Sequence, residues 1–285
     1  MAPKLPIDSL EVEFGNKIQF TSEPLFSNHA FKINESEFEL SIEGVATYKV
    51  KGGRHIDIIP HEGADKESIE LFLNGSVLGA VLFQRGIIPL HGSSFIHKGK
   101  GVIVCGASGA GKSSVTAAFC KRGAQFINDD ISPVAILQNS SHSNNLPEIL
   151  PIFSTIKLWK DSLLDLGYEQ SGLRKIRPSM EKFYLPVDKS TNINIKLDTV
   201  IILTTHQAEE FKSEVLTGIS KYNVLRRNIY RKSYLRGMPE TSKKFFSQLI
   251  NIASQIDVVL ITRPKRARIA DTVDFIDNDS LIWKR

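Results

Sequence analysis

The sequence predicts an α/β fold, in which a smaller β-containing region over residues 1–66 precedes a larger α/β domain over residues 67–285. Two observations predict it. Residues 11–60 contain segments that alternate apolar and polar side chains, with turn residues between them, as half-buried strands do. From about residue 87 onward, short apolar strand patterns mix with patterns of helical period, which is typical of an α/β domain.

Residues 67–86 carry apolar side chains at three- and four-residue spacing, which predicts one or two helices with a C-cap at Gly86. Two short strands then flank a turn at residues 98–101. A helix follows from Lys112 and ends before Gly123, and residues 124–129 form another strand.

The polar, Ser- and Asn-rich residues 137–149 predict a loop or small insertion. The remaining predicted elements, in chain order, are a strand that becomes a helix (154–167), a buried strand (197–206), helices (220–235 and 242–256), a strand (258–264) and a final helix (270–279).

The composition is that of an ordinary globular protein, with 41% hydrophobic and 24% charged residues. The net charge of +5 fits a partner rich in phosphate or carboxylate, but a solvated surface gives the same value. Cys105 and Cys120 lie in apolar segments without metal-ligand spacing, as buried reduced thiols do. The N-terminus lacks a signal-peptide pattern, and no apolar run approaches the ~20 residues of a membrane helix. We therefore expect a cytoplasmic protein without a membrane partner.

One segment carries a specific chemical signal, because it matches G-x-x-x-x-G-K-[ST] between an apolar strand and a helix. In such a P-loop (Walker A motif), backbone N–H groups and the helix N-terminus converge on a nucleotide phosphate. The lysine reaches the β- and γ-phosphates, and the hydroxyl after it ligates Mg²⁺. The predicted nucleotide-binding residues are Gly106, Ala107, Ser108, Gly109, Ala110, Gly111, Lys112, Ser113 and Ser114.

Asp129 and Asp130 end the strand after this helix, and Asp129 comes 17 residues after Lys112. A right-handed crossover would bring that strand back parallel to the strand before the loop, so that both carboxyl ends lie at one edge of the sheet. Two carboxylates at that edge can hold Mg²⁺ and accept a proton from an attacking hydroxyl. A polar loop start is the alternative interpretation of either Asp alone.

Basic residues elsewhere give weaker signals. His91 precedes the loop strand and can stabilise charge or relay a proton there. His97 sits at a turn and is expected to be exposed. The basic stretch 263–268 follows a strand and can reach phosphate or an acidic substrate segment, although a solvated charge run is an equal alternative. Arg226, Arg227 and Arg231 are weaker candidates on a predicted helix.

Several signatures are absent from the sequence. It has no NKxD-type guanine reader and no LSGGQ-type segment, which argues against a Ras-like GTPase and an ABC ATPase. No interleaved aromatic and basic pattern points to nucleic acid as a partner.

Residues 90–130, LHGSSFIHKGKGVIVCGASGAGKSSVTAAFCKRGAQFINDD, resemble the catalytic core of the HPr kinase/phosphorylase family. That resemblance implies a P-loop core like that of phosphoenolpyruvate carboxykinase. It extends over about residues 68–276 to the shorter HPr-kinase-like proteins, some of which phosphorylate a lasso-peptide precursor on its C-terminal serine. The family's downstream Glu-x-Arg-Gly signature has no counterpart here, so the resemblance does not extend to HPr as acceptor or to the phosphorylase reaction.

By this resemblance, Lys112 is the phosphate lysine, Ser113 supplies the metal hydroxyl, and His91 lies near the transferred phosphate. Of the acidic pair, Asp129 is expected to be the general base and Asp130 to help hold Mg²⁺, with the reverse division left open. Homo-oligomers are expected because HPr kinases are hexamers.

These expectations together predict an ATP-dependent kinase, with GTP not excluded as donor, that phosphorylates a serine of a peptide or protein. Three alternatives stay open: a kinase for a small hydroxyl-bearing molecule, a nucleotide-sensing regulator without transfer activity, and carboxykinase-like chemistry on an oxo-acid.

Overall fold

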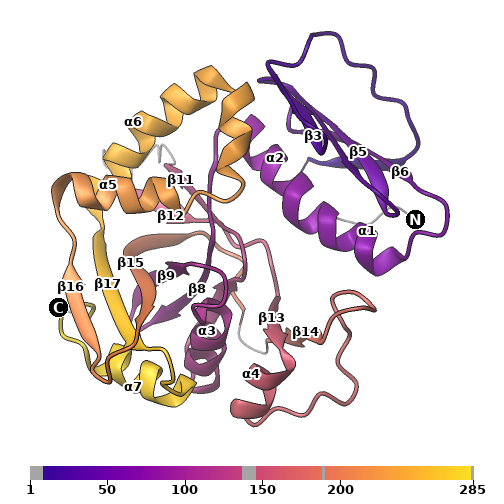
Figure 1. Ribbon diagram of the computed structural model, residues 1–285. Coiled ribbons are helices and arrows are strands. Elements are labelled where there is room, and N and C mark those ends of the chain that lie inside the picture. The colour runs from indigo at the N-terminus through magenta and orange to yellow at the C-terminus, as the bar shows by residue number, and fades with distance from the viewer. Residues whose placement is uncertain (1–8, 137–145, 188–189, 284–285) are drawn as a thin grey trace. The chain divides into compact units, whose positions relative to one another are not determined.

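The computed structural model describes residues 9–136, 146–187 and 190–283, and its architecture is mixed α/β with large sheets (Figure 1). The chain divides into two compact units. Unit 1 combines Met1–Pro89 with Ile176–Met180 and Tyr230–Ser247, and unit 2 holds Leu90–Lys175, Glu181–Ile229 and Gln248–Arg285. That residues 1–66 form a region of their own stays a prediction.

Unit 1 contains a six-stranded sheet with the order β1-β6-β5-β4-β3-β2, which confirms the predicted β-rich segment. In β5, buried and half-buried positions alternate, as the sequence pattern requires, and Tyr48 is fully buried there. The strands are β1 (Glu11–Phe14), β2 (Phe26–Ser27), β3 (Phe31–Ile33), β4 (Glu37–Ile42), β5 (Ala46–Lys51) and β6 (His55–Pro60).

The helical segment of unit 1 consists of α1 (Lys66–Phe72), a π-helical turn (Leu73–Val77) and α2 (Leu78–Gln84), next to the strands of this sheet in Figure 1. Asp65 caps the start of α1 by accepting a hydrogen bond from the Ser68 backbone N–H at 2.7 Å. After the last turn Gly86 adopts φ +69°, so the predicted C-cap glycine is confirmed. The Tyr48 hydroxyl donates to the Ile69 carbonyl at 2.9 Å and links sheet and helix.

Unit 2 is built on a sheet whose centre is β15 (Ile195–His206). This strand pairs in parallel with β9 (Lys100–Gly106) on one side and with β17 (Asp257–Pro264) on the other. β16 (Lys212–Val215) extends the sheet beyond β17, and β12 (Pro147–Ile149) with β11 (Ser132–Ile136) adds to the start of β15. β7 (Ile88–Leu90) precedes β8 (Gly92–His97) in the chain.

The strand before the acidic pair is β10 (Gln125–Asn128), and the expectation that a crossover places it beside the strand before the loop is wrong. It runs in the same direction as β9, as expected, but β8 lies between them and pairs antiparallel with both. The cause is the tight β8–β9 hairpin, whose turn residues Lys98 and Gly99 both have positive φ (49° and 76°). The hairpin partner therefore occupies the edge of β9 that the predicted crossover would have used.

One face of this sheet carries α3 (Lys112–Lys121) and α7 (Ile269–Asn278), which pack against each other (Figure 1). Phe119 of α3 stacks on Phe95 of β8 with ring centroids 4.7 Å apart, and both rings are fully buried. The N-terminus of α3 is therefore fixed relative to the ends of β9 and β10 by a packed core.

The predicted strand-to-helix segment is β13 (Thr155–Trp159) followed by α4 (Lys160–Asp165). β13 pairs antiparallel with β14 (Lys182–Pro186) in a separate two-stranded ribbon. The sequence patterns did not predict β11, β14 or β16. Residues 147–149 were expected in a loop but form β12, and residues 137–145 of that expected loop lie outside the described part of the chain.

The predicted helix over 220–235 is also wrong in part. α5 (Gly218–Arg227) ends before Asn228, Arg231 takes a left-handed conformation (φ +49°), and a 3-10 helix spans Lys232–Gly237. α6 (Pro239–Gln255) follows as predicted. Among the described residues no helix is long and apolar enough to span a membrane.

Candidate nucleotide-phosphate site

The glycine-rich loop Gly106–Ser113 joins the end of β9 to the start of α3, as the motif predicts. Glycine is required at two of its positions. A Cβ on Gly106 would lie 2.3 Å from the Leu203 carbonyl oxygen, and Gly111 caps α3 with φ +105°. These glycines allow the backbone to turn from a central strand directly into a helix N-terminus.

Lys112 is buried beneath this loop, with 8% of its surface exposed. Its ammonium donates to the carbonyls of Gly106 at 3.0 Å and Ala107 at 3.2 Å, so the loop curls around the cation. Burial lowers the pKa of Lys112 below the usual lysine value. An anion at the loop would stabilise the charged form of this lysine and replace its carbonyl partners.

The Ser113 hydroxyl donates a hydrogen bond of 2.7 Å to Oδ1 of Asp129. These two residues come from different elements, the first turn of α3 and the end of β10. The structure therefore brings the acidic pair to the glycine-rich loop, although β10 is not the neighbour of β9.

Asp129 is 2% exposed and accepts hydrogen bonds on both carboxylate oxygens. Besides Ser113, the Ser93 hydroxyl donates to Oδ1 at 2.5 Å, and the Lys157 backbone N–H donates to Oδ2 at 2.7 Å. Three donors thus fix the orientation of this carboxylate and compensate its burial.

Asp130 has a different environment, because its side chain is about a third exposed and it lines a cleft beside the loop. Its backbone is left-handed (φ +71°), a conformation that is uncommon for residues other than glycine. Lys157 Nζ lies 3.2 Å from Oδ2, and His91 Nδ1 lies 3.6 Å from Oδ1 and 2.9 Å from the Asp130 carbonyl oxygen.

The charges around Asp130 shift two pKa values. Burial alone would raise the pKa of Asp130, but Lys157, His91 and Lys182 outweigh it and hold the pKa at about 2. Burial, with the positive charge of Lys112, lowers the pKa of His91 below its ordinary value of 6.5. At neutral pH the cleft therefore contains an ionised Asp130 beside a neutral imidazole.

The cleft has a volume of about 150 Å³. Of the predicted residues, His91, Asp130 and six from the loop segment line it, and the six are Ser108, Gly109, Gly111, Lys112, Ser113 and Ser114. Gly106, Ala107 and Ala110 do not line it. The carbonyls of Gly106 and Ala107 instead accept from Lys112, and the Ala110 carbonyl accepts from Arg263 Nε and Nη2 at 3.2 and 3.1 Å.

Five residues that the sequence argument missed also line the cleft: Lys157, Leu158, Trp159, Ser162 and Lys182. Lys157 and Trp159 belong to β13, and Lys182 is the cross-strand partner of Trp159 in β14, with its ammonium 5.6 Å from the indole centroid. The sequence offered one indication of this site, because Lys157 lies between two apolar residues in a short strand pattern. Its side chain is only 7% exposed.

The basic residues that the sequence offered as weaker candidates have different positions and contacts in the structure. Arg263 supports the loop backbone through Ala110, whereas Arg268 pairs with Asp271 at 2.8 Å on α7. None of Arg226, Arg227 and Arg231 lines the cleft. His97 was expected to be exposed, which is wrong: its side chain is 17% exposed, bonds Asp277 at 2.9 Å and packs edge-on against the indole of Trp283.

Ser113 and the acidic pair supply only oxygen donors, the type of ligand that Mg²⁺ prefers. Ser113 Oγ and Asp129 Oδ1 already lie 2.7 Å apart, so both oxygens can reach a common point beside the loop. Among the described residues no group of three or more His, Cys, Asp or Glu side chains has the arrangement of a metal site. Magnesium at nucleotide sites commonly uses one or two protein ligands together with substrate phosphates and water.

Comparison with known proteins finds similarity to solved structures. No family model matches the chain, and no curated protein matches it in sequence. Among solved structures it is similar to the Hpr(Ser) kinase/phosphatase from Coxiella burnetii, at 14% identity and a TM-score of 0.33, over 67% of this chain and 88% of that one. Such a likeness is too distant to assign an activity, so the chemistry has to come from the residues of the site.

Proposed function

We propose that the chain is a phosphotransferase that binds ATP at the loop Gly106–Ser113 and transfers the γ-phosphoryl group to a serine hydroxyl of a peptide or protein. One observation carries the proposal: the hydroxyl at the start of α3 contacts the first carboxylate of an acidic pair, whose second carboxylate faces the cleft. Phosphoryl transfer requires phosphate binding, metal binding and a proton acceptor within one site.

The contacts of the acidic pair favour a division of roles opposite to the one expected from the sequence. Asp129 is buried and bonded to Ser113, which suits a residue that holds Mg²⁺ together with that hydroxyl. Asp130 is partly exposed to the cleft and ionised at neutral pH, which suits a residue that meets an incoming hydroxyl. We therefore assign metal binding to Asp129 and proton acceptance to Asp130.

In this mechanism, the loop backbone and the N-terminus of α3 hold the phosphates, and Lys112 moves from the carbonyls of Gly106 and Ala107 to phosphate oxygens. Mg²⁺ held by Ser113 and Asp129 would neutralise negative charge on the phosphates. Asp130 orients the acceptor hydroxyl and takes its proton as the bond to phosphorus forms.

The cations beside Asp130 have a role in the same step. Lys157 lies 3.2 Å from the Asp130 carboxylate, and its ammonium can stabilise the charge of the phosphoryl group in transit. His91 is neutral at pH 7, because burial and Lys112 lower its pKa, and can accept or relay a proton. The carboxylate of Asp130 has a pKa of about 2 and is a weak base, so its contribution is mainly to position the hydroxyl.

Two competing functions differ from this one in a measurable way. A small-molecule kinase would use the same residues with another acceptor. A nucleotide-sensing regulator would bind ATP without transfer, and the cleft-facing Asp130 argues against it, since a sensor has no need of a proton acceptor. Carboxykinase-like chemistry is a weaker candidate, because no residue set for an oxo-acid stands out.

The deciding experiment incubates the full chain with Mg²⁺ and γ-labelled ATP, separately with pools of serine-containing peptides and pools of hydroxylated metabolites. We expect label in peptides, on serine. Label only in small molecules would contradict the peptide assignment and support a small-molecule kinase. Binding of ATP without label in any pool would favour the regulator. Lys112→Met is the control, since loss of this phosphate cation should remove ATP binding and labelling together.

A further inference from the structure

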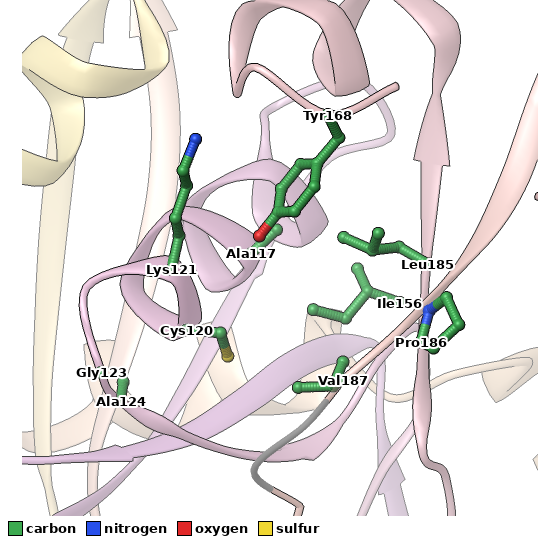
Figure 2. A pocket seen from close by; sticks show the side chains of 10 residues that line it. All are labelled: Ala117, Cys120, Lys121, Gly123, Ala124, Ile156, Tyr168, Leu185, Pro186 and Val187. Carbon is green, nitrogen blue, oxygen red and sulfur yellow. The ribbon is translucent and has the colours of Figure 1, made fainter. Parts of the chain in front are cut away.

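A second cavity of about 340 Å³ lies in unit 2 and shares no lining residue with the cleft at the loop (Figure 2). It is formed by the C-terminal half of α3, the residues after it, and the β13–β14 ribbon. The lining residues are Ala117, Cys120, Lys121, Gly123, Ala124, Ile156, Tyr168, Leu185, Pro186 and Val187. Cavities of about 300–1,000 Å³ are the usual size for small-molecule sites.

Most of the side chains that line the cavity are apolar. Ala117, Ala124, Ile156 and Leu185 are buried, and Figure 2 shows Ile156, Leu185 and Val187 facing the helix across the cavity. The Cys120 sulfur also points inward, and burial raises the pKa of this thiol to about 12, so it is a neutral part of the wall. Such a wall favours an apolar body of a ligand.

Among the ten lining residues, the one charged side chain is that of Lys121, and it is positive. Lys121 is an exposed residue at the rim, where its ammonium donates to the Leu166 carbonyl and lies 5.2 Å from the centroid of the Tyr168 ring. The Tyr168 hydroxyl points toward the cavity interior in Figure 2. None of the ten lining residues is acidic. A ligand with a negative group near Lys121 is therefore favoured over a cationic one.

Two elements connect this cavity with the nucleotide-phosphate site. Ile156 lines the cavity, and the next residue, Lys157, donates its backbone N–H to Asp129 at 2.7 Å and its ammonium to Asp130 at 3.2 Å. Ala117 and Cys120 belong to α3, the helix that begins with Lys112. Displacement of Ile156 or of α3 would therefore move groups that hold the acidic pair and the loop.

We infer that the cavity between α3 and the β13–β14 ribbon binds a small apolar carboxylate, with its hydrocarbon body against Ile156 and Leu185 and its carboxylate at Lys121, and thereby alters nucleotide binding. Binding itself is independent of the proposed function, while the regulatory effect rests on it. The ligand class follows from lining side chains that are mostly apolar, with a single cation at the rim and no acidic side chain among them.

The test uses the full chain with ¹³C-labelled Ile, Leu and Val methyl groups and 4-phenylbutyrate as the probe. We expect saturable shifts concentrated at Ile156, Leu185 and Val187. The uncharged analogue 4-phenylbutan-1-ol should bind about tenfold more weakly, since it lacks the charge-assisted contact. Shifts centred elsewhere, or no saturable shifts, would overturn the inference, and so would equal affinity for acid and alcohol.

Two variants provide matched controls. Lys121→Met keeps the side-chain stem and should reduce affinity for the acid to that for the alcohol, whereas Cys120→Phe should fill the cavity and abolish binding of both. Unchanged dispersion of the methyl signals outside the cavity verifies that each variant is folded. If Cys120→Phe does not fold, the rim variant Lys121→Met still decides, because unchanged affinity for the acid in that variant contradicts the assigned contact.

To test whether the cavity ligand alters nucleotide binding, the ATP affinity of the wild type is measured with and without saturating 4-phenylbutyrate. We expect a change of about threefold or more, the lower range of coupling between two sites. Unchanged affinity removes the regulatory claim and leaves the binding site. If the chain does not bind ATP, the proposed function fails, whereas the methyl shifts still report on the cavity.

Discussion

The hydroxyl of Ser113 donates to the carboxylate of Asp129 at 2.7 Å, and this contact joins the start of α3 to the end of β10. The two residues are separated by only 16 positions, but β8 lies between the strands that precede them. The contact therefore links the glycine-rich loop to the acidic pair.

We expect Asp130→Asn to reduce phosphoryl transfer by about 10²–10⁴-fold, because it removes the carboxylate that positions the acceptor hydroxyl and takes its proton, while ATP affinity stays within a few-fold. Single-turnover transfer and equilibrium ATP binding measure the two effects separately. Asp129→Asn is the matched variant and should weaken Mg²⁺-dependent ATP binding. The opposite pattern, with Asp129→Asn impaired only in transfer, would restore the roles expected from the sequence.

Ser113→Ala should weaken ATP binding about tenfold when Mg²⁺ is present, since one metal ligand and the donor to Asp129 are lost together. Without Mg²⁺ the difference between variant and wild type should shrink strongly. Calorimetric titration with ATP, with and without EDTA, tests this dependence. Ser254→Ala, which removes an exposed hydroxyl on α6 that donates to the Asn251 carbonyl at 2.7 Å, is the control and should change little. An equal loss with and without Mg²⁺ would argue against a metal role for Ser113.

His91 should titrate below pH 6.5, because burial and the ammonium of Lys112 both oppose its protonation. Since the pKa in the folded protein is lower than in the unfolded chain, the stabilising contribution is present above pH 6.5. It is lost as pH falls through the lowered pKa. NMR titration of the imidazole C–H signals gives the midpoint, with His91→Asn to assign it. In Lys112→Met the midpoint should rise, and an unchanged midpoint would mean that the charge of Lys112 does not reach the imidazole.

Phe119→Ala should lower the free energy of unfolding of unit 2 by about 3–5 kcal/mol, the usual cost of removing a buried aromatic ring. Phe119 is fully buried, and its ring centroid lies 6.4 Å from that of Trp283, so Trp283 fluorescence in a urea titration reports the loss. Leu164→Ala, at a position that is 56% exposed, is the matched control and should cost far less. A small effect at Phe119 would contradict the packing that fixes α3.

Local patterns in the sequence predicted most helices and the strands of regular alternation. The strand–loop–helix order around Gly106–Ser113 was also predictable, because its glycines, lysine and hydroxyl have fixed spacing and their chemistry is local. Short strands were the weak point: β11, β14 and β16 each span four or five residues, too few to show a period.

The sequence alone determined that a phosphate-binding loop, an acidic pair and a histidine occur within 40 residues of chain, from His91 to Asp130. Only the tertiary structure decided that β8 lies between β9 and β10, because a tight hairpin turn pairs β8 with the edge of β9. It also decided that Asp129 is buried against Ser113 and that Asp130 faces the cleft beside Lys157 from a distant strand. Burial and charge contacts depend on which elements pack together, and these long-range contacts are what divide the roles of two adjacent aspartates.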